Sequence, residues 1–202
     1  MTALAFIVVG YAVGLLWVPD LRQPFLRARI VDAPLAVFGH IAASAIALAI
    51  GPFQLSTRLR TRRLQLHRWM GRLYIISVIV GGFSAIALAT ASLGGVPAHV
   101  GFGLLGVLWV LTALVAYHRI KVYDIADHRR WMIRSYSLAF AAVTLRIYLP
   151  IALGVMRLPI DQAYPTISWL CWVPNLIVAE WWFLRKVPTS AQVPAPSDIF
   201  AA

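Results

Sequence analysis

The five histidines are the residues of this sequence with the clearest capacity to bind a metal or a haem iron, because imidazole nitrogens are strong ligands. Two of them begin related stretches: HRWMGRLY covers residues 67–74, and HRRWMIRSY covers residues 128–136. One inserted residue aligns His, Trp, Met, Arg and Tyr in the two stretches. Each stretch stands where a basic loop meets an apolar run, so both histidines are predicted to lie near the same membrane surface.

The elements that position these histidines are predicted to be transmembrane helices. The chain of 202 residues is 61% hydrophobic and 12% charged, whereas a soluble domain is about one quarter charged. Lipid is therefore its expected solvent. Residues 21–31 mix Arg with apolar residues and are predicted to lie along the membrane interface. Six apolar segments approach the ~20 residues that cross a bilayer: residues 3–18, 33–55, 69–91, 98–117, 131–153 and 167–184.

These segments predict an all-α polytopic membrane domain over residues 1–186, with six transmembrane helices. Helices two to five are expected to form a central four-helix bundle. Residues 187–202 are rich in Pro, Ser and Ala and are predicted to be a disordered cytoplasmic tail. The single Cys171 excludes an internal disulfide. The chain has 18 Lys and Arg against 7 Asp and Glu, an excess that is expected to reflect contact with anionic lipids and not with nucleic acid.

The basic residues divide unequally between the two ends of the predicted bundle. We call side A the end predicted to carry both termini, residues 56–66 and residues 118–127, and side B the opposite end. The positive-inside rule predicts that side A is cytoplasmic. Side A has Arg58, Arg60, Arg62, Arg63, Arg68, Arg72, Arg119, Lys121, Arg129, Arg130, Arg134, Arg185 and Lys186, and side B has Arg22, Arg27, Arg29 and Arg157.

A second pair of histidines lies toward side B, since FGHIAAS and AHVGFG contain His40 and His99. Segments two and three are interpreted as a helix pair that is duplicated as segments four and five, and such duplicated units often form a site at their interface. The central helices then carry one histidine each, with His40 opposite His99 and His67 opposite His128. Two imidazoles from facing helices can bind one haem iron, so up to two haem b groups are predicted.

The same histidines also permit other interpretations. His67 and His128 lie at segment ends near water, where they could bind lipid phosphate beside the arginines. His40 lies deeper, where a polar side chain is more often functional, although it could simply bond to a neighbouring helix. His67, His118 and His128 could instead form a non-haem site for zinc, copper or iron at side A.

Two charged residues fall within predicted spans. Arg146, toward side B, needs a carboxylate, a carbonyl array or an anionic ligand. A haem propionate, an anionic substrate and Asp161 are the candidates. Glu180, toward side A, is expected to pair with Arg134 or Arg72, and both arginines are further candidates for contact with a propionate or substrate.

The stretches HIAASAIALAIGPFQL, LHRWMGRLY, DHRRWMIRSYSLAFAAVTLRIYLP and WLCWVPNLIVAEW resemble a bacterial membrane protein family catalogued as domain of unknown function twenty-three zero six. The resemblance covers nearly the whole chain. It implies a multi-helix bacterial membrane protein and carries no established activity.

A more distant likeness concerns chemistry. Six helices with one histidine on each of helices two to five are similar to cytochrome b-five-sixty-one, a family that holds two haems between its central helices and moves electrons across a membrane. The resemblance implies that His40 and His99 bind one haem, and that His67 and His128 bind the other. It also implies a small reductant, which is ascorbate in that family and could be a quinol in a bacterial relative.

Three classes of function follow from these observations. The first is a haem b membrane oxidoreductase that transfers electrons. The second is a small-solute transporter or ligand-binding membrane protein without haem, with a polar site around His40, Arg146 and Asn175. The third is a protein with the non-haem metal site. The alternative to all three is a structural role in which the protein binds no ligand. No Ser–His–Asp set, Walker loop or HExxH motif is present to support a hydrolase or a nucleotide-driven protein, and no oligomeric state is predicted.

Overall fold

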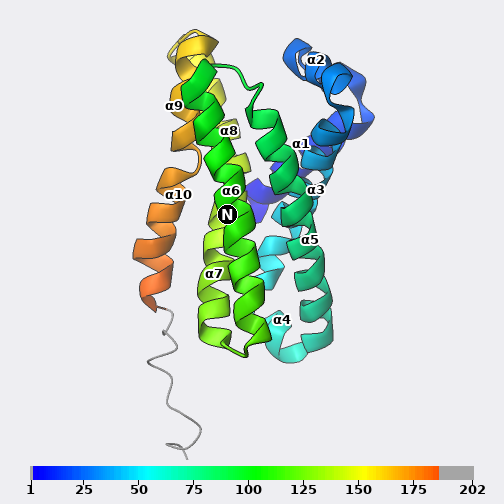
Figure 1. The fold of residues 1–202 in the computed structure, drawn as a ribbon, viewed down its shortest axis with the longest axis vertical. Helices are drawn as coiled ribbons and strands as arrows, with labels where there is room; N and C mark the ends of the chain where they lie inside the picture. The colour runs from blue at the N-terminus through cyan, green and yellow to red at the C-terminus, as the bar shows by residue number, and fades with distance from the viewer. Residues whose placement is uncertain (1, 187–202) are drawn as a thin grey trace, which may run out of the picture.

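The computed structural model describes residues 2–186, and every regular element in that range is a helix (Figure 1). Four helical stretches are long and apolar enough to cross a membrane, which confirms the predicted all-α membrane fold. The predicted tail, residues 187–202, lies outside the described residues. The four stretches are α3 (Pro34–Gln54), α5 (Leu64–Ala89), α6 (Gly95–Lys121), and Ile125–Val155, which joins α7 (Ile125–Ala139), α8 (Ala141–Pro150) and the π-helical η2 (Ile151–Val155).

These four stretches form an antiparallel bundle (Figure 1). Helix α3 packs on α5, α5 on α6 and α6 on α7, and contacts between α7 and α3 close the ring. Short connections between successive helices favour this arrangement of antiparallel neighbours. Helices α3 and α6 therefore stand diagonally across the bundle from each other, as do α5 and α7.

Side-chain caps explain where two helices begin at side A. Ser56 precedes α4 (Thr57–Arg62), and its Oγ accepts a hydrogen bond from Leu59 N at 3.4 Å. Asp124 precedes α7, and its Oδ1 accepts a hydrogen bond from Asp127 N at 3.0 Å. Both caps satisfy backbone N–H groups that have no partner in the first turn of a helix.

The first predicted span is shorter than a bilayer crossing. Helix α1 (Thr2–Trp17) has 16 residues, or about 24 Å of helix, and packs against α3 and α8. Arg22 stabilises its C-terminal end by donating from Nε and Nη2 to the carbonyl oxygens of Leu15 and Leu16, both at 2.8 Å. The chain continues at the side-B end through the 3-10 turn η1 (Pro19–Leu21) and α2 (Pro24–Asp32) (Figure 1).

The sixth predicted span is interrupted, although this part of the chain runs beside the bundle from side B to side A (Figure 1). The break falls at Trp172, where φ is −128°, and Pro174 stands in the first turn of the next helix, where its missing N–H costs no helical bond. Six spans are therefore not confirmed. The predicted duplication is not confirmed either, because α5 is continuous whereas its counterpart is divided at Phe140. The pieces are α9 (Ile160–Leu170), α10 (Val173–Val178), the π-helical η3 (Ala179–Phe183) and the 3-10 turn η4 (Leu184–Lys186).

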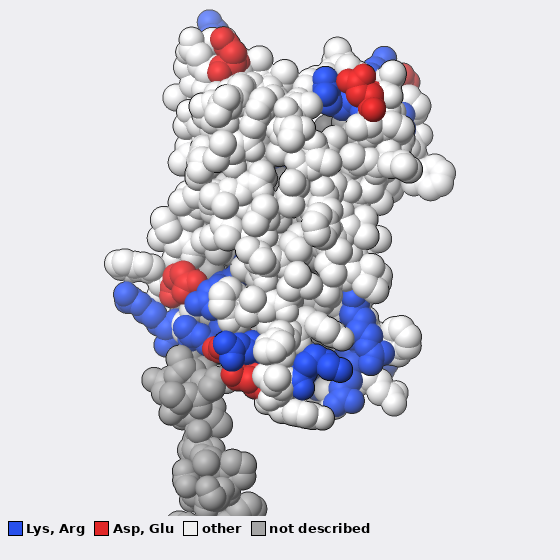
Figure 2. Space-filling model, viewed as in Figure 1, with Lys and Arg blue, Asp and Glu red and all other residues white. Residues whose placement is uncertain are grey.

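Charge and apolar surface are separated along the bundle. Figure 2 shows a broad band without charged side chains between two charged ends, and Lys and Arg gather at side A. Large apolar side chains such as Phe83 and Leu111 are exposed. Exposed apolar side chains are what the hydrocarbon core of a bilayer requires of a spanning helix.

The side-A half of the bundle is closely packed. Tyr74 and Ala47 are completely buried, and Tyr74 Oη lies 3.0 Å from Ser135 Oγ of α7. Gly51 of α3 faces the ring of Tyr136, and a Cβ atom at Gly51 would overlap that ring. The free space inside the bundle is found in the other half.

Candidate functional site

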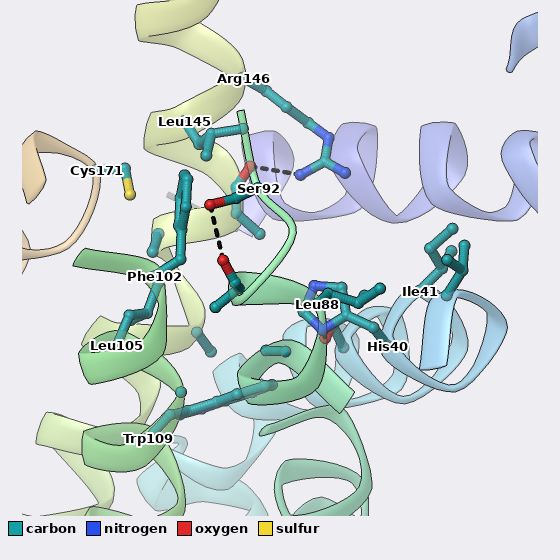
Figure 3. A pocket seen from close by; sticks show the side chains of 18 of the residues that line it. His40, Ile41, Leu88, Ser92, Phe102, Leu105, Trp109, Leu145, Arg146 and Cys171 are labelled. Atoms are coloured by element: carbon teal, nitrogen blue, oxygen red, sulfur yellow. Dashed lines mark hydrogen bonds between the residues drawn. The ribbon is translucent and has the colours of Figure 1, made fainter. Parts of the chain in front are cut away.

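A cavity of about 290 Å³ lies within the side-B half of the bundle (Figure 3). Helices α2, α3, α5, α6, α7 and α8 line it, and Tyr164 of α9 contributes to its wall. Phe102, Leu105 and Trp109 present an apolar face from α6. A concave, mostly apolar space with a few polar groups is the usual form of a small-molecule site, and we call it the His40 cavity.

His40 lines this cavity from α3, together with Ile41 and Ser44. The ring nitrogen Nδ1 bonds to the carbonyl oxygen of Gly81 on α5 at 3.0 Å, and Ser44 Oγ lies 3.4 Å from the same nitrogen. A carbonyl oxygen only accepts, so Nδ1 carries the proton in this bond. Nε2 then has no hydrogen-bond partner in the described part of the chain. A backbone bond at one ring nitrogen orients an imidazole for a ligand at the other.

Arg146 reaches the same cavity from α8 (Figure 3). Its Nη1 donates to the carbonyl oxygen of Ala142 at 2.9 Å, and its guanidinium carbon lies 5.3 Å from the centre of the Tyr11 ring. Nε is buried without a hydrogen-bond partner. Within residues 2–186 no carboxylate pairs with Arg146, and the predicted alternative, Asp161, is exposed in the first turn of α9.

A smaller cavity of about 50 Å³ adjoins His40 and Arg146 on the side of α1. Val8 and Ala12 line it from α1, and these two residues are buried. Helix α1, which packs on α3 and α8, therefore forms an outer wall of the site. The residues shared by the two cavities are His40, Ile41, Ser44, Ala142 and Arg146.

Helix α2 contributes a second arginine to the His40 cavity. Arg29 lines the cavity beside Phe25, and its guanidinium carbon lies 5.7 Å from the centre of the Phe25 ring. Arg29 Nη2 is 3.2 Å from Asp32 Oδ2. Because this pair is neutral as a whole, Arg146 supplies the uncompensated positive charge at the cavity.

His99 does not face His40 across the cavity. It lies in the first turn of α6, and its Nε2 is 3.0 Å from the carbonyl oxygen of Ser92 in the turn between α5 and α6. His40 is the histidine that lines the cavity. The geometry therefore gives no support to the predicted bis-histidine pair at side B.

His67 and His128 do lie near each other at side A, close enough for their imidazoles to interact electrostatically. His128 Nδ1 donates to the carbonyl oxygen of Ala116 on α6 at 2.7 Å. His67 Nδ1 is buried without a hydrogen-bond partner in the described residues. Neither residue lines the His40 cavity or its smaller neighbour.

The predicted non-haem metal site is not formed. His118 is exposed in the last turn of α6. Among residues 2–186, no three His, Cys, Asp or Glu side chains gather where they could hold a metal ion.

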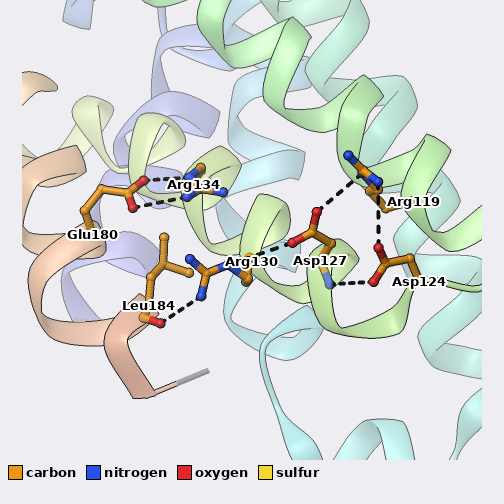
Figure 4. Close-up of polar contacts among 7 residues, drawn as sticks. All are labelled: Arg119, Asp124, Asp127, Arg130, Arg134, Glu180 and Leu184. Carbon is orange, nitrogen blue, oxygen red and sulfur yellow. Dashed lines mark hydrogen bonds and ion pairs between the residues drawn. The ribbon is translucent and has the colours of Figure 1, made fainter. Parts of the chain in front are cut away.

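Arg134 and Arg72 also lie outside the cavity. Arg134 donates from Nε and Nη2 to the two carboxylate oxygens of Glu180 at 2.6 and 3.1 Å (Figure 4), which confirms the predicted ion pair in its Arg134 form. Arg72 is exposed and lies over the Trp69 ring at 5.3 Å from its centre. The pair with Glu180 holds the C-terminal helical pieces against α7.

Asn175, predicted as part of a polar site with His40 and Arg146, instead connects helices. Its Nδ2 donates to the carbonyl oxygens of Ser137 and Cys171 at 3.4 and 2.9 Å, and to Thr144 Oγ1 at 3.2 Å. Thr144 Oγ1 also donates to the Cys171 carbonyl oxygen. These bonds attach α10 to α7 and α8.

The fold and the cavity together define an all-helical integral membrane protein with space for a small molecule inside its bundle. The family described as "Predicted membrane protein (DUF2306)" matches residues 37–183, which is more than half of the chain. The chain belongs to this family, as predicted. No curated protein and no solved structure matches it, so the likeness to cytochrome b-five-sixty-one has no support.

Some cavity residues had a signal in the sequence and others did not. Val37, His40, Ile41 and Ser44 recur at spacings of three, four and seven, which places them on one face of a helix. Arg29 had no comparable signal, because its approach to the cavity depends on how α2 folds back over the bundle.

Proposed function

We propose that this protein binds a small amphipathic molecule in the His40 cavity. The observation that carries the proposal is that His40 and Arg146, on α3 and α8, line one mostly apolar cavity of about 290 Å³. Both residues present ring or guanidinium nitrogens that have no partner in the described residues. Polar groups that converge on an apolar cavity fix the orientation of a ligand.

Arg146 gives an energetic reason for a ligand. A guanidinium group within the membrane is expensive unless other groups pair with it. One carbonyl oxygen and the face of Tyr11 supply part of that compensation. A ligand with hydrogen-bond acceptors would supply the remainder.

The packed side-A half supports ligand binding over transport through the bundle. Trp109 is 5% exposed and stands at one end of the cavity, as Figure 3 shows. Beyond it, Tyr74 and Tyr136 fill the interior between α3, α5 and α7. A solute that crossed to side A would require all three aromatic side chains to move.

Photolabelling in lipid nanodiscs tests this proposal with two probes, a ten-carbon alcohol and a ten-carbon carboxylic acid that each carry a diazirine on the chain. We expect labelled peptides from α5 and α6 that include Leu88 or Leu105. Ala85→Phe fills the cavity from α5 and should reduce labelling at least about tenfold, whereas Ala87→Phe changes an exposed position of the same helix and should not. Equal labelling of both variants by both probes would contradict the proposal.

Haem b is a second candidate ligand, favoured by the unpartnered Nε2 of His40, which is the form of imidazole that binds iron. Haem b is larger than the cavity of about 290 Å³, so its binding would require the lining helices to move apart. Arg146 and Arg29 are suited to hold propionates. Bound haem would supply electron-transfer chemistry with a quinol or another small reductant, as in a membrane oxidoreductase. Of the two side-B histidines, His40 would hold the iron, because His99 does not line the cavity. The predicted haem between His67 and His128 stays a prediction.

The visible spectrum of the purified protein tests the haem proposal directly. A Soret band that falls in His40→Ala and persists in His118→Ala would support it, since His118 is exposed and serves as the control. Protein isolated from haem-replete cells without a Soret band would exclude it.

We also propose that side A faces the cytoplasm of a bacterial inner membrane and contacts anionic lipids. The arginines of α4 and its neighbours support this orientation. Cys171 is buried, so single cysteines can be introduced at exposed Thr61 and Val96, at side A and side B respectively. A membrane-impermeant maleimide applied to intact cells should label Val96→Cys and not Thr61→Cys, and the reverse pattern would contradict the orientation.

A further inference from the structure

We infer that the ligand of the His40 cavity is a monoanionic amphiphile: a carboxylic acid with a medium-length apolar chain, whose carboxylate binds Arg146. Its chain would lie against Phe102, Leu105 and Trp109. This inference rests on the proposed function and adds the chemical class of the ligand.

The charge of the cavity requires one negative group. Arg29 is compensated by Asp32, whose Oδ2 lies 3.2 Å from its Nη2. Arg146 has no carboxylate partner in the described chain. A single carboxylate therefore neutralises the site, whereas a dianionic phosphate would leave one negative charge in an apolar environment, at a high cost.

The free edge of the guanidinium matches a carboxylate. Nη1 of Arg146 is occupied by the Ala142 carbonyl oxygen at 2.9 Å. Nε is buried and has no hydrogen-bond partner, and no bond from Nη2 is found within residues 2–186, so a small rotation of the guanidinium would turn both nitrogens toward a ligand. Nε and Nη2 form one edge of the planar group, and two parallel N–H bonds from such an edge to a carboxylate are a strong and specific pairing.

The depth of the lining residues sets the direction of the chain. Arg146 lies nine residues before Val155, where the spanning stretch ends toward side B, which is about 13 Å along the helix. Trp109 lies fourteen residues after Gly95, the first residue of α6, or about 21 Å from side B. Figure 3 shows Arg146 and Trp109 at opposite ends of the cavity, with His40 and Leu105 between them. The charged head would thus lie closer to side B, and the chain would lie deeper in the bundle.

The volume limits the length of the chain. The cavity measures about 290 Å³, and one water molecule takes up about 30 Å³ of liquid. A space several times the size of a water molecule suits a ligand with one apolar chain of medium length. A membrane phospholipid with two long acyl chains is several times too large.

Competition against the carboxylate photoprobe tests the inference in nanodiscs. Decanoate should compete at least about tenfold better than decanol, because the alcohol lacks the charge that pairs with Arg146. Arg146→Gln should weaken decanoate by at least about tenfold and leave decanol within about twofold. Arg146→Lys should recover only part of the loss, since an ammonium group lacks the planar edge. Arg157→Gln, an exposed side-B arginine outside the cavity, should change neither.

The possible outcomes separate this inference from the proposed function. Labelling of Arg146→Gln by the alcohol probe at the same peptides shows that this variant retains the cavity. If decanol and decanoate compete equally in the unmodified protein, or if decyl phosphate competes better than decanoate, the inference that the ligand is a monoanionic carboxylate is wrong. The cavity would still be a binding site. If neither probe labels the cavity-lining peptides, the proposed function fails as well.

Discussion

In the side-A half of the bundle, the buried tyrosines Tyr74 and Tyr136 have hydrogen-bond partners, whereas in the side-B half His40 and Arg146 line a cavity. Tyr74 Oη lies 3.0 Å from Ser135 Oγ, and Tyr136 Oη donates to the Leu48 carbonyl oxygen at 3.5 Å. In the other half, Arg146 Nε and His40 Nε2 have no partner in the described residues. The same helices therefore provide packing at one end and unsatisfied polar groups at the other.

The comparison indicates that the side-B half is packed less completely than the side-A half. Side chains that border unfilled space lack contacts on that side, so about 290 Å³ of space represents packing that larger side chains could have supplied. A bundle selected only for stability would fill it with larger side chains than Ala85 and Ala142. Open space beside an uncompensated arginine is therefore better explained by a ligand than by loose packing.

The largest effect is expected where the packed half leaves no room for a single methyl group. Gly51→Ala would place Cβ against the Tyr136 ring, and we expect a loss of about 3 kcal/mol or more in the free energy of unfolding. Gly103→Ala is the control, since its Cβ would come only within 3.9 Å of Ala89 Cβ. Unfolding titrations in mixed detergent–SDS micelles, followed by circular dichroism, measure both. Equal stability of the two variants would show that the halves do not differ in packing.

An intermediate effect, opposite in the two halves, is expected from the substitution of Ala by Leu. Ala47 is fully buried in the side-A core, and Ala47→Leu should cost about 1–3 kcal/mol through overpacking. Ala85 lines the cavity, so Ala85→Leu should cost less than about 0.5 kcal/mol or increase stability. The same titrations apply, and a loss at Ala85 as large as that at Ala47 would contradict a permanent cavity.

The smallest effect is expected at the surface of side A. Glu180 is 43% exposed in its bidentate pair with Arg134, so Glu180→Gln should cost only about 0.2–1 kcal/mol. The loss should shrink as salt screens the pair. Asp161→Asn is the control, because Asp161 forms no ion pair in the described residues. If Glu180→Gln instead lowered the free energy of unfolding by several kcal/mol at every salt concentration, the Glu180–Arg134 pair would behave as a buried ion pair and the prediction would be wrong.

The long apolar helices and the basic end were predictable because each follows from a property of a local segment. The four longest segments reappear as helices that can cross a membrane, and Glu180 pairs with Arg134, one of its two predicted partners. The end segments were less predictable. The first segment, residues 3–18, was already short in the sequence and α1 has 16 residues, but hydropathy alone did not show that the helix breaks at Trp172.

The failed prediction that His40 and His99 face each other shows why the candidate site was harder to predict than the helices. Their helices do stand diagonally in the bundle, as expected. Gly94, which precedes α6, and Gly95, its first residue, have φ 89° and 69°, a conformation that glycine adopts readily. The turn between α5 and α6 brings the Ser92 carbonyl oxygen within 3.0 Å of His99 Nε2, so the imidazole bonds locally instead of lining the cavity.

The amino-acid sequence by itself determined the solvent of this protein, its helical class, its family and its basic end. Composition, apolar length and charge act through the transfer of each segment between water and lipid, which depends little on the rest of the chain. The tertiary structure alone decided that Arg146, Arg29 and His40 share one cavity while His99, His118 and Asn175 do not. That choice depends on the rotation of each helix and on contacts between segments far apart in sequence, and residue periodicity does not encode either of them.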